Sequence, residues 1–189
     1  MSDKNIIKRL LDISYENQLH HLGSYFSCIE TIDDIYKQMD DDDIFILSNG
    51  HAAVALYVVL EKHFGLNAEM LLKEMGEHPK RNELKKVHCS TGSLGMGITV
   101  AVGRALADKD REVYCMISDG ECSEGAVWES LRFINEHKLE NIQIYVNANG
   151  WAAYDSVDLL YLEKRLKAFY PRINFINTTV EKYGLSGLS

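Results

Sequence analysis

Ser118-Asp119-Gly120 follows the apolar run of residues 112–117, and a second apolar run, residues 142–146, leads to Asn149. The stretch between them, which contains Glu124-Gly125-Ala126-Val127-Trp128-Glu129, has the character of a helix. Two apolar strands joined by a helix indicate parallel neighbours in a sheet, whose ligands bind at the carboxyl ends of the strands. Asp119 and Asn149 would both lie at such ends, so we expect them to form one site.

The chemistry of this pair favours a metal ion that carries a diphosphate. Asp119 and Asn149 offer oxygen ligands, which Mg²⁺ prefers together with phosphate oxygens and water. A helix that begins near Ser123 would direct free N–H groups at the same anion, and Gly120 would let the backbone approach it. An Asp-Gly pair alone is more often a plain turn, and the spacing to Asn149 makes the binding site the more specific interpretation.

The rest of the chain alternates between strands and helices, which predicts an α/β fold with a parallel sheet covered by helices on both faces. We expect a single domain over residues 1–189. The expected helices cover residues 5–15, 30–39, 51–64, 92–108, 123–138 and 159–169, and the expected strands cover residues 44–47, 112–117, 142–146 and 173–178.

Composition narrows the class of protein. With 46% apolar and 25% charged residues, the 189-residue chain has the composition of a globular protein, and no apolar run is long enough to span a membrane. A net charge of −8 without a basic stripe argues against nucleic acid as a partner. Four cysteines without zinc-ligand spacing and an N-terminus unlike a signal peptide favour the cytoplasm. The acidic run 40–43 is expected to be a solvated turn.

Further motifs stand in a fixed order around the Asp119–Asn149 pair. They are His21-Leu22-Gly23-Ser24, Leu47-Ser48-Asn49-Gly50-His51-Ala52, Gly76-Glu77-His78-Pro79, Ser90-Thr91-Gly92-Ser93-Leu94-Gly95-Met96-Gly97, Trp128-Glu129-Ser130 and His137-Lys138-Leu139-Glu140-Asn141. Together the set resembles the N-terminal half of transketolases, the domain that binds the diphosphate of thiamine diphosphate. The family carries Gly-Asp-Gly followed about thirty residues later by Asn. The sequence departs from the family at Ser118, where the family has Gly, and at Met96, where it has Gln.

The resemblance implies a role for each matching residue near the cofactor. Asp119, Asn149 and the backbone carbonyl of Trp151 would bind Mg²⁺, or Ca²⁺ or Mn²⁺ in its place. Gly92 and Leu94 would reach the thiazolium ring. A serine at position 118 can adopt ordinary strand dihedrals, so metal binding should survive unless that position requires positive φ.

The resemblance also assigns catalytic roles. His21, His51 and His78 would line the substrate funnel, where imidazoles contact the cofactor diphosphate and substrate oxygens and can move protons. Alone, each would more often be a surface or structural histidine. Glu124 and Glu129 would form a carboxylate relay across a dimer interface, and Glu124 would also contact the cofactor. The simpler alternative for Glu124 is a favourable charge near a helix N-terminus.

In transketolases the glutamate that activates the cofactor sits on a separate pyrimidine-binding domain, and 189 residues leave no room for it. The resemblance therefore implies one subunit of a split enzyme, with a C-terminal pyrimidine-domain subunit as partner in a dimer of heterodimers. The expected reaction transfers a two-carbon ketol unit between sugars or sugar phosphates. Two alternatives stay open. One is another thiamine-diphosphate enzyme, either a decarboxylase or an enzyme like deoxyxylulose-phosphate synthase, and the other is a non-catalytic subunit that only binds the cofactor.

Overall fold

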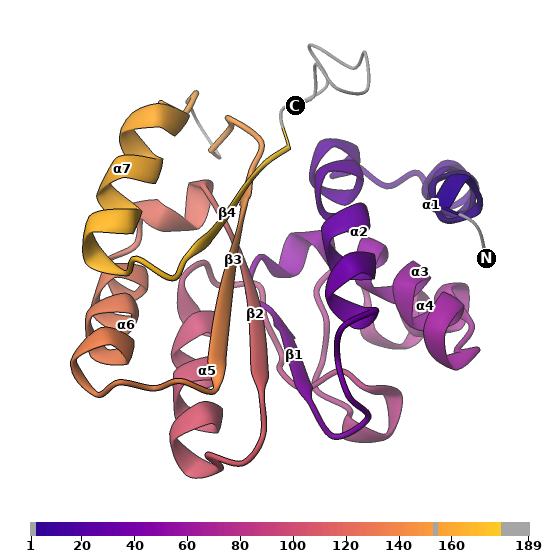
Figure 1. Ribbon diagram of the computed structural model, residues 1–189. Coiled ribbons are helices and arrows are strands. Elements are labelled where there is room, and N and C mark those ends of the chain that lie inside the picture. The colour runs from indigo at the N-terminus through magenta and orange to yellow at the C-terminus, as the bar shows by residue number, and fades with distance from the viewer. Residues whose placement is uncertain (1–2, 153–154, 179–189) are drawn as a thin grey trace.

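The computed structural model describes residues 3–152 and 155–178, and it contains one four-stranded parallel sheet. The strands are β1 (Ile44–Leu47), β2 (Val113–Ser118), β3 (Ile142–Ala148) and β4 (Asn174–Asn177), and they lie in the order β1-β2-β3-β4 (Figure 1). The register aligns Ile44 with Val113 and Val113 with Ile142, so the strands end close to one edge. The α/β fold with a parallel sheet is confirmed.

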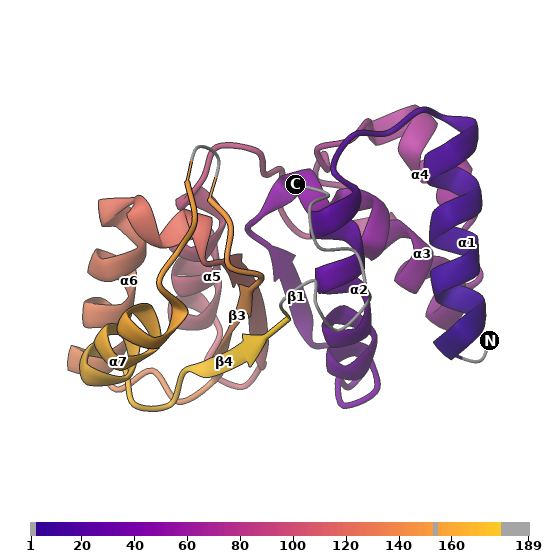
Figure 2. The ribbon, with the colours of Figure 1, turned by 90° about the horizontal axis from the view of Figure 1, so that it is seen from above.

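Alternate side chains of each strand enter two separate cores. Phe45, Leu47, Tyr114, Met116 and Tyr145 lie on one face of the sheet and share a core with the helices α1 (Asp3–Glu16), α2 (Leu22–Tyr36), α3 (Ala53–Phe64) and α4 (Ala68–Met75), of which α1 and α4 pack on α3 as an outer layer. Their neighbours, which include Ile46, Cys115 and Ile144, pack on the other face against α5 (Met96–Ala107), α6 (Gly125–Glu136) and α7 (Leu159–Phe169). Figure 2 shows the sheet between these two helical layers. Burial on both faces explains why the strands read as nearly continuous apolar runs.

The outer helix α1 is bound to its layer by both packing and charge. Ile6, Leu10 and Ile13 are fully buried, at the spacing of one helical face. Arg9 pairs with Glu61 of α3 at 3.0 Å and with Glu69 of α4 at 2.8 Å.

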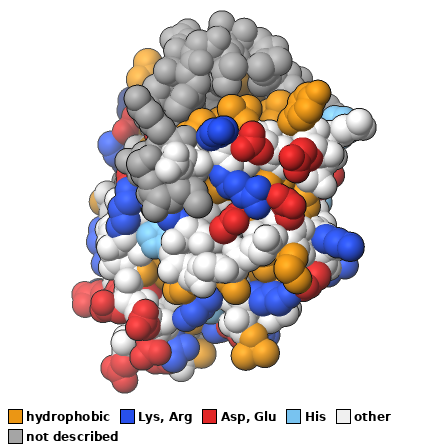
Figure 3. Space-filling model, turned by 90° about the vertical axis from the view of Figure 1, so that its right-hand side faces the viewer, with side chains coloured by type: hydrophobic (Ala, Val, Ile, Leu, Met, Phe, Trp, Pro, Cys, Tyr) orange, Lys and Arg blue, Asp and Glu red, His pale blue; other side chains and the backbone are white. Residues whose placement is uncertain are grey.

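On the face of the molecule drawn in Figure 3, acidic and basic side chains are interspersed, with hydrophobic side chains scattered among them.

Several predicted boundaries are wrong. The helix expected over residues 30–39 is α2, which begins at Leu22 and ends at Tyr36. The helix expected from residue 92 begins only at Met96, because Gly92 and Gly95 have φ values of 157° and 76°, outside the helical region. A 3₁₀ turn, Gly50–Ala52, precedes α3, and another, Gly120–Ser123, precedes α6. Helix α4 has no counterpart among the expected helices.

Asn141 fixes the start of β3 against the end of α5. Its amide group donates to the carbonyls of Ala105, Asp108 and Arg111 at 2.9–3.0 Å. Asn141 is 8% exposed, so it supplies a buried donor to Ala105 in the last turn of α5, where helix carbonyls lack partners within the helix, and to two carbonyls of the segment that follows. Across the described ranges 3–152 and 155–178, no helix has the length and apolar character needed to cross a membrane.

Candidate active site

Asp119 follows directly on β2, and its carboxylate is 2% exposed. Oδ1 accepts the backbone N–H of Gly120 at 3.0 Å, and Oδ2 accepts the backbone N–H of Gly150 at 2.7 Å. The second bond holds the ends of β2 and β3 together, as the predicted parallel pairing requires. Burial raises the pKa of Asp119 to about 6 even though these backbone N–H groups oppose the increase. The buried carboxylate would therefore gain from a cation beside it.

Asn149 and Trp151 lie on the turn that follows β3. Asn149 Oδ1 accepts the Trp151 backbone N–H at 2.9 Å, which folds this turn back on itself. A Cβ added to Gly120 would lie 3.3 Å from the Cα of Ala152 and 3.7 Å from the Trp151 carbonyl oxygen. The absence of a side chain at Gly120 thus leaves space beside that carbonyl. A carboxylate, an amide and a carbonyl at two adjacent strand ends form a donor set that fits Mg²⁺ bound to a diphosphate.

The Gly92–Gly97 loop packs tightly against this edge of the sheet. Thr91 Oγ1 donates to the Leu47 carbonyl at 2.7 Å, which fastens the loop to the end of β1. A Cβ on Gly95 would lie 2.8 Å from the Cβ of Glu124, and one on Gly92 would lie 3.1 Å from the His78 ring. These approaches explain the glycines, because a side chain at either position would displace a residue of the site.

The structure brings the three predicted histidines together. The ring centroid of His21 lies 5.5 Å from that of His51 and 6.5 Å from that of His78. His21 and His78 are exposed and His51 is half-buried. Burial, followed by the charges of His21 and His78, lowers the pKa of His51 from 6.5 to about 4. His51 is therefore neutral near pH 7, so one ring nitrogen donates and the other accepts a hydrogen bond.

Glu124 and Glu129 lie at and just after the start of α6, and both are exposed in this chain. Glu124 is the N-cap residue of α6, but its side chain makes no capping hydrogen bond. Its Cβ packs against Gly95, so its carboxylate is carried beside the Gly92–Gly97 loop. The helix expected to begin near Ser123 begins two residues later, because the 3₁₀ turn Gly120–Ser123 stands between Asp119 and α6.

Sequence reasoning missed two buried polar groups of this region. Glu121, which is 0% exposed, accepts hydrogen bonds from Ser48 Oγ at 2.7 Å and from the Gly95 N–H at 2.8 Å. Asn49 donates to Cys28 Sγ at 3.2 Å, and its Oδ1 has no hydrogen-bond partner in the part of the chain that is described. Both residues stand inside or beside the motifs. The spacing of Ser118 and Glu121 is that of a capping box, which is a local signal for Glu121, whereas only burial distinguishes Asn49 from an ordinary loop residue.

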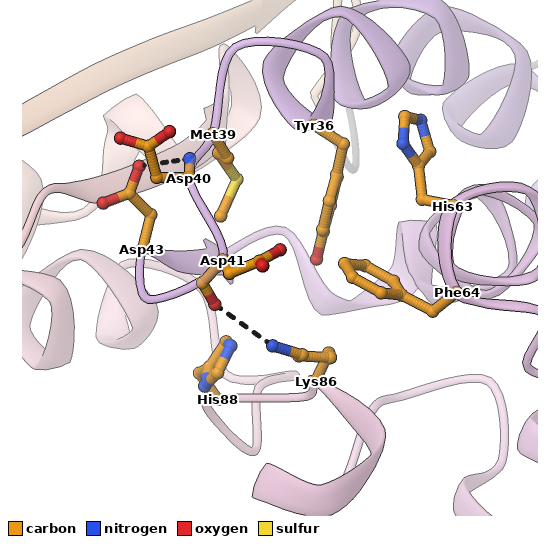
Figure 4. A pocket seen from close by; sticks show the side chains of 9 residues that line it. All are labelled: Tyr36, Met39, Asp40, Asp41, Asp43, His63, Phe64, Lys86 and His88. Carbon is orange, nitrogen blue, oxygen red and sulfur yellow. Dashed lines mark hydrogen bonds between the residues drawn. The ribbon is translucent and has the colours of Figure 1, made fainter.

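A separate pocket of about 170 Å³ lies at the opposite end of β1, around the turn of residues 40–43 (Figure 4). Lys86 donates to the Asp41 carbonyl there at 3.2 Å and places its ammonium group 5.3 Å from the centre of the Phe64 ring. Asp40, Asp41 and Asp42 are exposed, which confirms the predicted solvated turn. Because the pocket lies at the start of β1 and Asp119 follows the end of β2, the two do not share lining residues.

The parallel fold, with Asp119 and Asn149 following adjacent strands, is that of an α/β domain that binds its ligand at the carboxyl ends of its strands. The chain belongs to the transketolase thiamine-diphosphate-binding domain family, whose model matches residues 24–171. This confirms the resemblance that the motifs carry.

Relatives agree with this assignment. The chain is 34% identical to one of the subunits of apulose-4-phosphate transketolase in Phocaeicola vulgatus, over 78% of this chain and 59% of the relative. It is 35% identical to transketolase of Homo sapiens, over 71% of this chain and 24% of the relative. The crystal structure of transketolase from Campylobacter jejuni superposes with a TM-score of 0.63 at 21% identity, covering 89% of this chain and 32% of that chain. The chain thus spans about three fifths of the first relative and a quarter of the second.

Proposed function

We propose that this chain is the diphosphate-binding subunit of a two-component transketolase-like enzyme, with residues 1–189 forming one cofactor-binding domain. The observation that carries the proposal is the meeting of Asp119, the Asn149–Trp151 turn and the Gly92–Gly97 loop at one edge of the sheet. The histidine cluster adjoins the same loop through the contact of Gly92 with His78.

In this proposal the Asp119 carboxylate, the Asn149 amide and the Trp151 carbonyl hold Mg²⁺, or Ca²⁺ or Mn²⁺, and the metal holds the diphosphate of thiamine diphosphate. Gly120 leaves space for the phosphate, and Gly92 and Leu94 lie beside the thiazolium ring. When bound, thiamine diphosphate supplies the carbon nucleophile needed for ketol transfer.

The histidines act on the diphosphate and on the substrate. His51, neutral near pH 7, donates a hydrogen bond to a diphosphate or substrate oxygen without adding charge. His21 and His78, both exposed beside it, contact the hydroxyl and carbonyl oxygens of a sugar and exchange protons with them. Imidazoles whose ring centroids lie 5.5 Å and 6.5 Å from that of His21 suit a polyhydroxylated substrate better than a simple 2-oxo acid.

The pyrimidine pocket and the activating glutamate come from a partner protein. Support comes from the relative in Phocaeicola vulgatus, whose name describes one component of a multi-subunit transketolase. A second copy of this chain covers the α5–α6 surface, where Met96, Val100 and Leu106 are 51%, 38% and 46% exposed. Glu124 lies beside Gly95, the residue before Met96, and Glu129 follows on α6. A dimer of heterodimers that buries both carboxylates would make them a relay between sites.

A binding experiment tests the metal site directly. Isothermal calorimetry with thiamine diphosphate and Mg²⁺ should give saturable binding to the wild type and at least roughly tenfold weaker binding to Asp119→Asn, because a metal–carboxylate contact is lost. Asp42→Asn removes an exposed carboxylate far from the site and should bind like the wild type. Equal binding by Asp119→Asn and the wild type would refute the metal assignment.

A turnover experiment tests the two-component enzyme. The isolated chain should show negligible ketol transfer, and addition of the pyrimidine-domain partner should restore it with a ketose donor. The sugar phosphate in the relative's name, apulose 4-phosphate, is the first donor to assay. Turnover by the isolated chain would exclude the split arrangement. Release of CO₂ from pyruvate by the complex would point to a different thiamine-diphosphate enzyme, and tight cofactor binding without turnover would indicate a non-catalytic role.

The proposed cell compartment follows from the cysteines. All four, Cys28, Cys89, Cys115 and Cys122, are free and buried. We place the enzyme in the cytoplasm, where thiols stay reduced.

A further inference from the structure

Ser118 and Glu121 form a reciprocal pair of hydrogen bonds around the metal-binding turn. The backbone N–H of Ser118 donates to Glu121 Oε2 at 3.1 Å, and the backbone N–H of Glu121 donates to Ser118 Oγ at 3.2 Å. This is the pattern of a capping box, in which Ser and Glu three positions apart satisfy each other's backbone donors. Here it encloses the two residues Asp119 and Gly120.

The other oxygen of Glu121 extends the pair to two distant segments. Oε1 accepts the Ser48 hydroxyl at 2.7 Å and the Gly95 backbone N–H at 2.8 Å. One carboxylate thus joins the end of β1, the end of β2 and the loop that leads into α5. Only glycine suits this position, because its φ of 76° is left-handed and a Cβ there would lie 2.8 Å from the Glu124 Cβ.

A capping box does not require burial, yet this glutamate is 0% exposed. Burying a carboxylate is unfavourable unless hydrogen bonds replace its water, and a glutamate facing solvent could cap the same turn without that loss. What the buried position adds is the connection to Ser48 and Gly95. The arrangement also accounts for Ser118 in place of the family's glycine, because a glycine has no hydroxyl to accept the Glu121 N–H.

We propose that Glu121, paired with Ser118, is a positioning residue that sets the Asp119 turn and the Gly92–Gly97 loop at the spacing needed to receive the cofactor diphosphate. It acts through its neighbours and does not itself touch the metal or the cofactor. The inference rests on the proposed function, since it assumes that Asp119 and the loop bind the two ends of one ligand.

The first test measures cofactor affinity and fold separately. Glu121→Gln, which places an amide N–H₂ against either the Ser118 N–H or the Gly95 N–H, should weaken binding of thiamine diphosphate with Mg²⁺ by about tenfold. The matched control is Glu136→Gln, an exposed glutamate on α6 that pairs only with Arg132 among the contacts described. The control should bind like the wild type, and thermal unfolding should show all of these proteins folded at the assay temperature.

The second test needs no cofactor. Amide hydrogen exchange at Ser118 or at Gly95 should accelerate in Glu121→Gln, because one of these N–H groups then faces a donor in place of its acceptor. Exchange at both positions should stay unchanged in Glu136→Gln. A double-mutant cycle of Ser118→Ala and Glu121→Gln should show non-additive effects on the dissociation constant, as expected for residues in direct contact.

The outcomes separate this inference from the proposed function. If the wild type fails to bind thiamine diphosphate, the proposed function fails. If the wild type binds and Glu121→Gln binds within about twofold of it, with unchanged exchange at Ser118 and Gly95, the positioning role is overturned. Should Glu121→Gln fail to fold, Ser118→Ala and Ser48→Ala carry the test, since each removes one hydroxyl that contacts Glu121. Wild-type affinity in both would then contradict the proposal.

Discussion

Gly97 of α5 packs against the backbone of Ser48 at the end of β1: a Cβ built on Gly97 would lie 2.5 Å from the Ser48 Cα. No side chain fits there, because the obstacle is backbone and cannot rotate away. We expect Gly97→Ala to lower the free energy of unfolding by about 1–3 kcal/mol, the usual cost of overpacking. Urea denaturation measures the change.

Gly103 provides the matched control on the same helix. A Cβ at Gly103 would meet no atom within 4 Å. Gly103→Ala should raise the free energy of unfolding by about 0.5–1 kcal/mol, because alanine loses less backbone entropy in a helix than glycine. Equal destabilisation by both substitutions would contradict the steric explanation for Gly97 and the expected gain in helix propensity at Gly103.

Asp33 should make folding stability depend on pH in the acid range. Its buried carboxylate lies 2.7 Å from Lys62, 2.8 Å from Lys37 and 2.9 Å from His63. Burial alone would raise the pKa of Asp33, but the three hydrogen-bonding side chains outweigh it and lower the pKa from 3.8 to about 2. The stabilisation is therefore complete above pH 3.8 and is lost as the pH falls towards 2.

Asp33→Asn should accordingly lose about 2 kcal/mol of unfolding free energy at pH 7, with the difference from wild type shrinking below about pH 4. Asp34→Asn, on the exposed side of the same helix, should change stability by less than about 0.5 kcal/mol. Chemical denaturation across the pH range tests both. A difference that stays constant down to about pH 2 would contradict the ion-pair explanation.

His51 should titrate far below an ordinary histidine, because burial and two neighbouring histidines lower its pKa from 6.5 to about 4. Between pH 6.5 and 4 the unfolded chain binds a proton at this position and the folded chain does not. This group therefore reduces stability as the pH falls through that window. NMR of the His51 ring in the cofactor-free chain should show it neutral at about pH 5.5, whereas a midpoint near 6.5 would contradict the buried environment.

We expect substitution of Asn141, which lies at the other end of β3 from the candidate site, to lower the stability of the fold. Asn141→Ala removes the donor of three carbonyls and should lower the free energy of unfolding by about 1–3 kcal/mol. Asn135→Ala, at an exposed position of α6, should change it by less than about 0.5 kcal/mol. A thermal or urea unfolding series compares them.

Local patterns predict the strands and several helices well. The bounds of β1 and α7 match the expected residues 44–47 and 159–169, since clear turn or capping signals flank both. The expected start of α2 is eight residues too late. Tyr25, Phe26, Cys28 and Ile29 are all buried, and a helix buried nearly all round has no alternation to read.

Helix α4 escapes sequence-based prediction although its signals are local. Asn67 caps it by accepting the Met70 N–H at 2.8 Å, Leu71, Leu72 and Met75 are buried, and Gly76 ends it with φ of 81°. At eight residues it is too short for periodicity to be distinctive.

The spacing of the motifs is enough to predict which residues of the candidate site lie close together. Asp119 meets the turn that carries Asn149, the histidines cluster as expected, and Ser118 lies in β2 without positive φ. The spacing of Ser118 and Glu121 indicates a capping box, but the links from Glu121 to Ser48 and Gly95 cannot be predicted, because these residues become neighbours only when the sheet forms.

The hydrogen bond from Ser48 to Glu121 joins positions 73 residues apart in the chain. Closing such a long loop has an entropic cost, and the bond can form only when both distant segments are in place. No short segment can therefore bind the cofactor in advance of the rest. During synthesis, the site can assemble only after β1, the Gly92–Gly97 loop, β2 and the turn at Gly150 have all left the ribosome.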